Sequence, residues 1–142
     1  MITVEEALER ILARVGTLAD ERVARLDPLD RVLAEPVVAD REIPPWPNSS
    51  MDGYAVSSAD TSGASAESPA ALRMAGHVAA GHLAERPLAR GEAFRILTGA
   101  PLPEGADAVI PQEDVQADGA AVRIPRPLPP RGFGWPRGED LP

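Results

Sequence analysis

The 142-residue chain contains no cysteine and no lysine. Without cysteine, disulfide bonds and thiolate-bound metal sites are excluded. Without lysine, an anionic ligand has to be bound by arginine side chains or by backbone N–H groups. Aromatic residues make up only 4% of the chain, whereas hydrophobic residues make up 44%, which is enough for a modest core. The length fits a single domain, or one domain with an extension.

The chain is acidic, with a formal net charge of −8 at pH 7. This charge argues against nucleic acid or an anionic membrane as a partner. No apolar run is long enough to span a bilayer. The acidic, amphipathic N-terminus has none of the features of a signal peptide. We therefore expect a soluble, cytoplasmic protein.

The beginning of the chain predicts a helix. Thr3 and Glu6 have the spacing of a capping box, and apolar residues follow at helical spacing as far as Val15. Gly16 is a suitable end for this helix. The apolar stripe fits either the core of the chain itself or the surface of a partner subunit.

A short strand is predicted next, over residues 23–26, followed by a short second helix. Asp27 is a suitable N-cap for that helix, and Pro28 suits its first position. Val32 and Leu33 would supply its buried side.

The remainder of the chain has mainly β patterns. Residues 57–70, which are rich in Ser, Ala and Gly, predict a mobile surface loop. Residues 125–136, which are dominated by Pro, Arg and Gly, predict an extended connector whose arginines either serve solubility and stiffness or face an anion. The predicted strands lie at 54–56, 72–78, 93–97 and 106–110, with a hairpin over 115–124 that turns at Asp118-Gly119. The fold class is therefore α+β, mainly β, with a helical N-terminal segment before a small β domain.

The most specific stretch runs from Ile43 to Val56 and reads IPPWPNSSMDGYAV. Its three prolines restrict the backbone, and the Asn-Ser-Ser run after them consists of turn formers. Asp52 and Gly53 form a tight-turn pair with a carboxylate at its tip. From spacing alone, an ordinary β-hairpin is the favoured interpretation.

A second loop follows the strand predicted over residues 93–97. Thr98 carries a hydroxyl, and Gly99 allows another backbone to approach closely. The hydroxyl can bind a phosphate group, or it can cap its own turn. The two histidines, His77 and His82, share neither a helix face nor a strand face, so we expect both at the surface.

Three blocks resemble signatures of the MoeA/gephyrin-E family, the molybdopterin molybdenumtransferases. They are residues 44–56 (PPWPNSSMDGYAV), residues 96–110 (ILTGAPLPEGADAVI) and residues 137–140 (RGED). The blocks occur in the family's order and span nearly the whole chain. They correspond to the N-terminal portion of the family only.

The resemblance implies a role in inserting molybdate into adenylated molybdopterin, with Mg²⁺-dependent hydrolysis of the adenylate, in molybdenum cofactor biosynthesis. It also implies a homodimer in which the small β domain of one subunit faces the α/β domain of the other. The expected domains are a helical linker segment (1–40), a small β domain (41–135) and the start of a return into the linker (136–142). The family's α/β domain and C-terminal barrel have no counterpart here, so we expect an N-terminal fragment that is inactive alone.

The resemblance further assigns roles to individual residues. Asp52 and Thr98 are the implied catalytic residues, and Asp140 is the candidate Mg²⁺ ligand, which could share the ion with Asp52 beside a pyrophosphate. Alternatively, Asp52 only pins its turn and Asp140 caps a following helix. Glu113, at a position where the family often has an acid, ranks below both. The implied substrate-binding residues are Ser50, Met51, Gly53, Tyr54 and Gly99.

An alternative hypothesis is a non-catalytic scaffold or interaction module that keeps the family fold. A scaffold need not retain both Met51–Tyr54 and Thr98–Ala100, and this chain has both. A sugar- or peptide-binding β domain is a third option, supported only by the β content. The loop chemistry favours the enzyme-derived interpretation.

Overall fold

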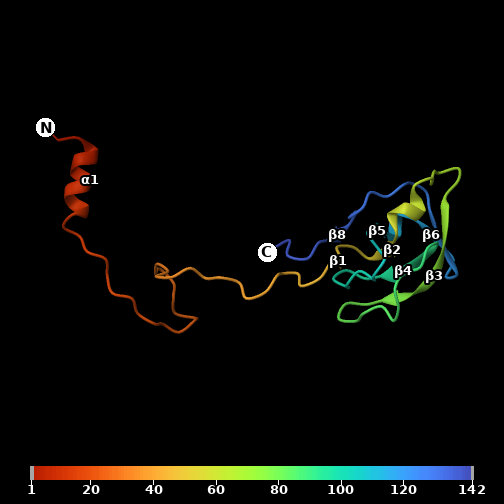
Figure 1. The fold of residues 1–142 in the computed structure, drawn as a ribbon, viewed down its shortest axis with the longest axis horizontal. Helices are drawn as coiled ribbons and strands as arrows, with labels where there is room; N and C mark the ends of the chain where they lie inside the picture. Colours follow the sequence, from red (N-terminus) through yellow and green to blue (C-terminus); the bar gives the residue numbers. More distant parts are fainter. Residues whose placement is uncertain (1, 142) are drawn as a thin grey trace. The chain divides into compact units, whose positions relative to one another are not determined.

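The computed structural model describes residues 2–141, and the chain forms two compact units (Figure 1). Met1–Val38 make up the first unit and Ala39–Pro142 the second. The first unit contains the α-helix, and the second contains every strand of the described chain. No helix within residues 2–141 is both long enough and apolar enough to cross a membrane.

Helix α1 (Val4–Leu12) begins as the sequence predicts. The Thr3 hydroxyl accepts a hydrogen bond from the Glu6 backbone N–H, and the Glu6 carboxylate accepts one from the Thr3 N–H, both at 3.2 Å. This reciprocal pair satisfies two N–H groups that have no partner inside the helix. Its apolar residues remain exposed, with Leu8 at 54% and Ile11 at 58%. The helix is therefore stabilised by local interactions. Whether its apolar stripe packs on the chain itself or on a partner subunit is not decided by these contacts.

The strand predicted over residues 23–26 and the helix predicted after it are wrong. Between α1 and Ile43 the chain has turns and bends but no helix or strand. Asp30 has a φ of 63°, a left-handed conformation that cannot continue a right-handed helix. Val32 is 95% exposed and Leu33 is 71% exposed. A helix this short is unstable without a surface against which to pack, so the N-cap and proline signals were insufficient.

The second unit is built on a six-stranded mixed sheet with the order β5-β2-β4-β3-β7-β6. Strands β3 and β4 pair in parallel, and the other neighbours pair antiparallel. The predicted mainly β, α+β fold is confirmed, and each predicted strand after residue 50 overlaps an observed one. The strands are β2 (Gly53–Val56), β3 (Ala70–Val78), β4 (Glu92–Ile96), β5 (Ala108–Pro111), β6 (Gln116–Ala117) and β7 (Ala121–Ile124).

A second, two-stranded sheet joins β1 (Asn48–Ser49) to β8 (Gly134–Trp135). Strand β1 does not pair with β2, which lies between β4 and β5. The ordinary-hairpin interpretation of this stretch is therefore wrong, and the polar run turns a corner between two sheets. Residues 125–136, predicted as an extended connector, contain no helix and no strand of the six-stranded sheet, but β8 in this segment pairs with β1 and Leu128 is buried to 6% exposure.

The segment predicted as a mobile surface loop, residues 57–70, is anchored at its start. It begins with the 3-10 helix η1 (Ser58–Thr61), in which Thr61 is fully buried. The Thr61 hydroxyl donates to the Ser58 carbonyl at 2.8 Å and accepts from the Leu128 N–H at 3.0 Å. Sequence composition missed this role because the hydroxyl is satisfied by a residue 67 positions away.

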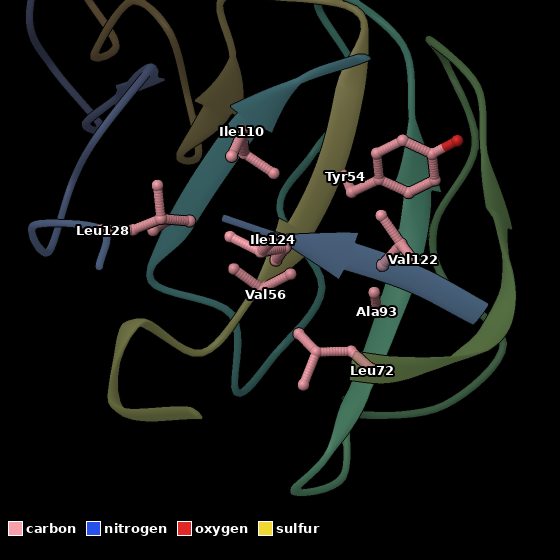
Figure 2. Close-up of a cluster of buried hydrophobic side chains, with 9 residues drawn as sticks. Tyr54, Val56, Leu72, Ala93, Ile110, Val122, Ile124 and Leu128 are labelled. Carbon is pink, nitrogen blue, oxygen red and sulfur yellow. The ribbon is translucent and has the colours of Figure 1, made fainter. Parts of the chain in front are cut away.

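Both faces of the six-stranded sheet carry buried apolar side chains. Successive residues of a strand point to opposite faces, so β2 places Tyr54 and Val56 in one cluster and Ala55 in the other. Figure 2 shows the first cluster gathered between β2, β4, β5 and β7. The second cluster contains Ala55, Val78, Leu88, Phe94, Ile96, Ala100 and Val109. All four residues of β2 are buried as a result.

An irregularity in β3 lets one strand serve both clusters. Leu72 belongs to the first cluster and Val78 to the second, although even spacing would place them on the same face. The register shifts between Met74 and Gly76, which reverses the alternation. A Cβ at Gly76 would lie 3.0 Å from the Phe94 ring. Glycine therefore leaves room at the bulge for the aromatic side chain.

We predict that Gly53→Ala destabilises the second unit. An ideal Cβ at Gly53 would lie 2.0 Å from the Ile110 carbonyl oxygen, so β2 and β5 would have to separate. Overpacking a well-packed interior costs about 1–3 kcal/mol, and a backbone clash falls at the upper end. Urea unfolding followed by tryptophan fluorescence measures the free energy of unfolding. Gly63→Ala is the matched control, because nothing lies within 4 Å of its Cβ position; equal losses in the two variants would contradict the prediction.

Candidate functional site

Antiparallel pairing of β2 and β4 brings the two predicted catalytic residues together. Gly53 is the register partner of Ile96, so Asp52, just before β2, lies beside the residues that follow β4. The Thr98 backbone N–H and its hydroxyl each donate to Asp52 Oδ1, both at 2.8 Å. Two residues 46 positions apart thus form one hydrogen-bonded pair. Their catalytic role stays a prediction.

These hydrogen bonds set the ionisation of the exposed Asp52 carboxyl. The Thr98 N–H, then the Thr98 hydroxyl, and to a smaller extent the charge of Arg95 lower the pKa of Asp52 below its ordinary 3.8. Because the depressed value belongs to the folded state, the stabilisation is present above pH 3.8 and is lost as the pH falls through the folded pKa. The carboxylate is therefore ionised at neutral pH.

The backbones of the two signature loops bond directly to each other. The Gly99 N–H donates to the Ser49 carbonyl at 2.8 Å, and the Ser49 N–H donates to the Ala100 carbonyl at 2.9 Å. Gly99 has a φ of 79°, a left-handed conformation that glycine adopts without strain. Ser49 is fully buried, and its hydroxyl donates to the Met51 carbonyl at 2.6 Å. The polar loop is therefore fixed before it reaches Asp52.

The segment just before β8 binds the signature loop at Ser50. The Phe133 carbonyl accepts from the Ser50 hydroxyl at 2.8 Å and from the Ser50 N–H at 3.0 Å. The remaining predicted substrate-binding residues differ in exposure. Met51 is 37% exposed, whereas Tyr54 is 9% exposed and its ring lies 5.2 Å from the Arg95 guanidinium. In Figure 2 the Tyr54 hydroxyl points away from the other labelled side chains.

Asp140 lies against the start of the signature segment. Its backbone N–H donates to the Ile43 carbonyl at 2.9 Å, beside the bridge between Ile43 and Leu141. No hydrogen bond among residues 2–141 joins Asp140 to Asp52 or Thr98. Within the same residues, no three His, Asp or Glu side chains are grouped closely enough to hold a metal ion. A role for Asp140 as a Mg²⁺ ligand stays a prediction.

Two of the C-terminal arginines have carboxylate partners. Arg126 pairs with Asp114 at 2.7 Å, and Arg137 pairs with Glu42. These pairs favour the structural interpretation of the arginine-rich segment over an anion-facing one. His77 and His82 are both exposed, as predicted.

Sequence analysis missed two polar groups behind the loop. Arg95 Nη1 donates to the Gly53 carbonyl at 2.9 Å, and the Gln112 N–H donates to the Asp52 carbonyl at 3.1 Å. Gln112 begins the 3-10 helix η2 (Gln112–Asp114). An arginine between Phe94 and Ile96 in a predicted strand indicates only a solvent-facing position, so the sequence carried no signal for this contact.

Residues 2–142 match the family described as the MoeA N-terminal region, domains I and II. The chain belongs to this family. It is 38% identical to the molybdopterin molybdenumtransferase of Synechococcus elongatus over 146 residues, which cover 99% of this chain and 36% of that protein. It is 42% identical to the Bacillus subtilis molybdopterin molybdenumtransferase over 116 residues, or 82% of this chain and 27% of that protein.

The MoeA fold is also found in solved structures. A crystal structure of the molybdopterin biosynthesis MoeA protein from Pyrococcus horikoshii OT3 matches 96% of this chain and 36% of that one, with a TM-score of 0.88 and 36% identity. The chain therefore spans about a third of the length of these MoeA relatives. The resemblance to the N-terminal portion of the MoeA/gephyrin-E family is confirmed.

We predict that Thr98→Val raises the pKa of Asp52. Valine removes the hydroxyl donor and keeps the backbone N–H donor, which has the larger effect, so the pKa returns only partway to its ordinary value. An NMR titration of the Asp52 side-chain carboxyl measures the change. Thr61→Val is not a suitable control because Thr61 is buried, so Thr17→Val, in the other unit, is used instead. An unchanged Asp52 titration in Thr98→Val would show that the hydroxyl bond is absent in solution.

Proposed function

We propose that this chain forms the N-terminal region of a molybdopterin molybdenumtransferase, which inserts molybdate into adenylated molybdopterin in molybdenum cofactor biosynthesis. The observation that carries the proposal is the Asp52–Thr98 pair, which joins two family signature loops at one exposed point. An ionised carboxylate held by two donors is a suitable group for orienting a substrate or a cation.

The donor set at Asp52 fits Mg²⁺. The ion prefers carboxylate oxygens and usually binds through one or two carboxylates together with substrate phosphates. Asp52 Oδ1 accepts both Thr98 bonds, and no group within residues 2–141 donates a hydrogen bond to Oδ2. We propose Asp52 Oδ2 as the protein ligand. A bound Mg²⁺ would neutralise negative charge on the phosphates of the adenylate.

The surface beside the loop supports a protein partner. Large apolar side chains surround it, with Trp46 at 49% exposure, Trp135 at 46%, Phe133 at 43% and Met51 at 37%. Both tryptophans and one of the two phenylalanines of an aromatic-poor chain are thus exposed around the signature loop. Aromatic residues and methionine are enriched at protein interfaces. We propose that the loop faces the α/β domain of a second subunit in a homodimer.

The remaining features of the proposal rest on composition. The acidic charge supports an enzyme without nucleic acid or anionic-membrane partners, and we further propose that the enzyme is cytoplasmic. A scaffold module is the second candidate, and the same exposed aromatic residues would serve it. A scaffold need not retain both Met51–Tyr54 and Thr98–Ala100, and the presence of both in this chain favours the enzyme.

A chimera tests the proposal. This chain replaces the matching region of the Synechococcus elongatus transferase, and molybdenum cofactor formation is measured in cells that lack their own enzyme. We expect the chimera to be active and Asp52→Asn to reduce activity by about 100-fold or more, because it removes a charge from the site while keeping an oxygen for Thr98. Asp20→Asn, at an exposed position in the first unit, is the matched control. An active Asp52→Asn chimera would refute the catalytic role, and an inactive parent chimera would favour the scaffold.

A further inference from the structure

Arg95 occupies an unusual position behind the signature loop. It lies on β4 directly opposite Tyr54 of β2, and its guanidinium stacks over the Tyr54 ring at 5.2 Å. The side chain is half-buried. Stacking on an aromatic ring restrains an arginine in one orientation while leaving its N–H groups free to donate.

The guanidinium donates to one group in β2 and to one group in η2. Nη1 donates to the Gly53 carbonyl at 2.9 Å, and Nη2 donates to the Gln112 side-chain carbonyl. Gln112 in turn donates its backbone N–H to the Asp52 carbonyl at 3.1 Å. The two consecutive carbonyls of Asp52 and Gly53 are therefore held by one connected pair of residues, Arg95 and Gln112.

Most arginines of the second unit pair with a carboxylate, whereas Arg95 does not; within residues 2–141, Arg131 is the one other arginine of this unit without such a partner. Arg73 and Arg86 pair with Glu92, Arg90 with Asp60, Arg123 with Asp118 and Arg126 with Asp114. No carboxylate lies within ion-pair distance of Arg95 in residues 2–141, and its hydrogen bonds go to neutral oxygens. An arginine that only stabilised the sheet would not need to be directed at the carbonyl next to Asp52.

We propose that Arg95, together with Gln112, is a positioning residue for Asp52: the guanidinium fixes the Asp52–Gly53 backbone so that the carboxylate meets both Thr98 donors. The inference deepens the proposed function and rests on it for its biological meaning. The orientation of Asp52 by Arg95 and Gln112 can be tested in this chain without any enzyme activity. The series of hydrogen bonds that starts at the guanidinium continues through the Gln112 side-chain amide, which donates to the Glu113 carboxylate at 3.3 Å.

Charge and position can be separated experimentally. Arg95→Lys keeps the positive charge but replaces the planar fork with a single ammonium group, which cannot reproduce the fork's fixed pair of bonds to Gly53 and Gln112. Arg95→Met removes both charge and donors. Gln112→Met removes the exposed side-chain amide and keeps the backbone N–H bond to Asp52. Arg123→Met, which removes a strand arginine that pairs with Asp118, is the matched control.

The test is an NMR study of the whole chain that follows two signals. The first is the Asp52 carboxyl titration, and the second is hydrogen exchange of the Thr98 amide. We expect Arg95→Lys and Gln112→Met to raise the pKa of Asp52 and to accelerate Thr98 exchange by about tenfold, as for the loss of one hydrogen bond. Arg95→Met should show larger changes, and Arg123→Met should match the parent chain.

The outcomes separate this inference from the proposed function. If Arg95→Lys and Gln112→Met both keep the parent titration and exchange, the positioning role is refuted, even when the chimera is active and needs Asp52. If both signals change while the chimera is inactive, the positioning role stands and the proposed function fails. Should Arg95→Met not fold, Gln112→Met alone still decides, because its side chain is exposed and lies outside the core.

Discussion

The contact between Gly53 and the Ile110 carbonyl is so close that no side chain fits between β2 and β5 at this point. Strand β2 is consequently locked between two neighbours and buried along its whole length. Asp52 directly precedes this strand. The direction of its backbone is therefore fixed by a buried strand and not by a free loop. Polar groups placed on rigid elements hold their geometry better than groups on flexible loops.

The register of β2 against β4 also determines both the packing of the core and the position of Asp52. With Gly53 opposite Ile96, Asp52 faces the start of the second signature loop, and Tyr54 lies opposite Arg95. A slip of one residue would move every side chain of β2 to the other face of the sheet. It would also part the Asp52 carboxylate from Thr98. The apolar clusters on the two faces therefore specify the site as well as the fold.

Local signals were sufficient where the chain satisfies its own groups nearby. The capping box at Thr3 and Glu6 and the Asp118-Gly119 turn were predicted because their partners lie within a few residues. The predicted helix after Asp27 failed for the opposite reason, since its apolar residues found no surface. The β1–β8 pair and the burial of Thr61 depend on contacts made across 67 or more residues, and no periodicity records them.

The site shows the same division. Motif resemblance singled out Asp52 and Thr98, and the structure brings them within hydrogen-bond distance. Motif resemblance could not single out Arg95, because an arginine in an alternating strand is normally a solvated residue. The proposed positioning role of Arg95 becomes visible only when β4 lies beside Gly53. The contacts missed from sequence are thus those that orient the residues found from sequence. A signature motif identifies the groups at the surface of a site, whereas their orientation depends on strand register, which only the folded chain defines.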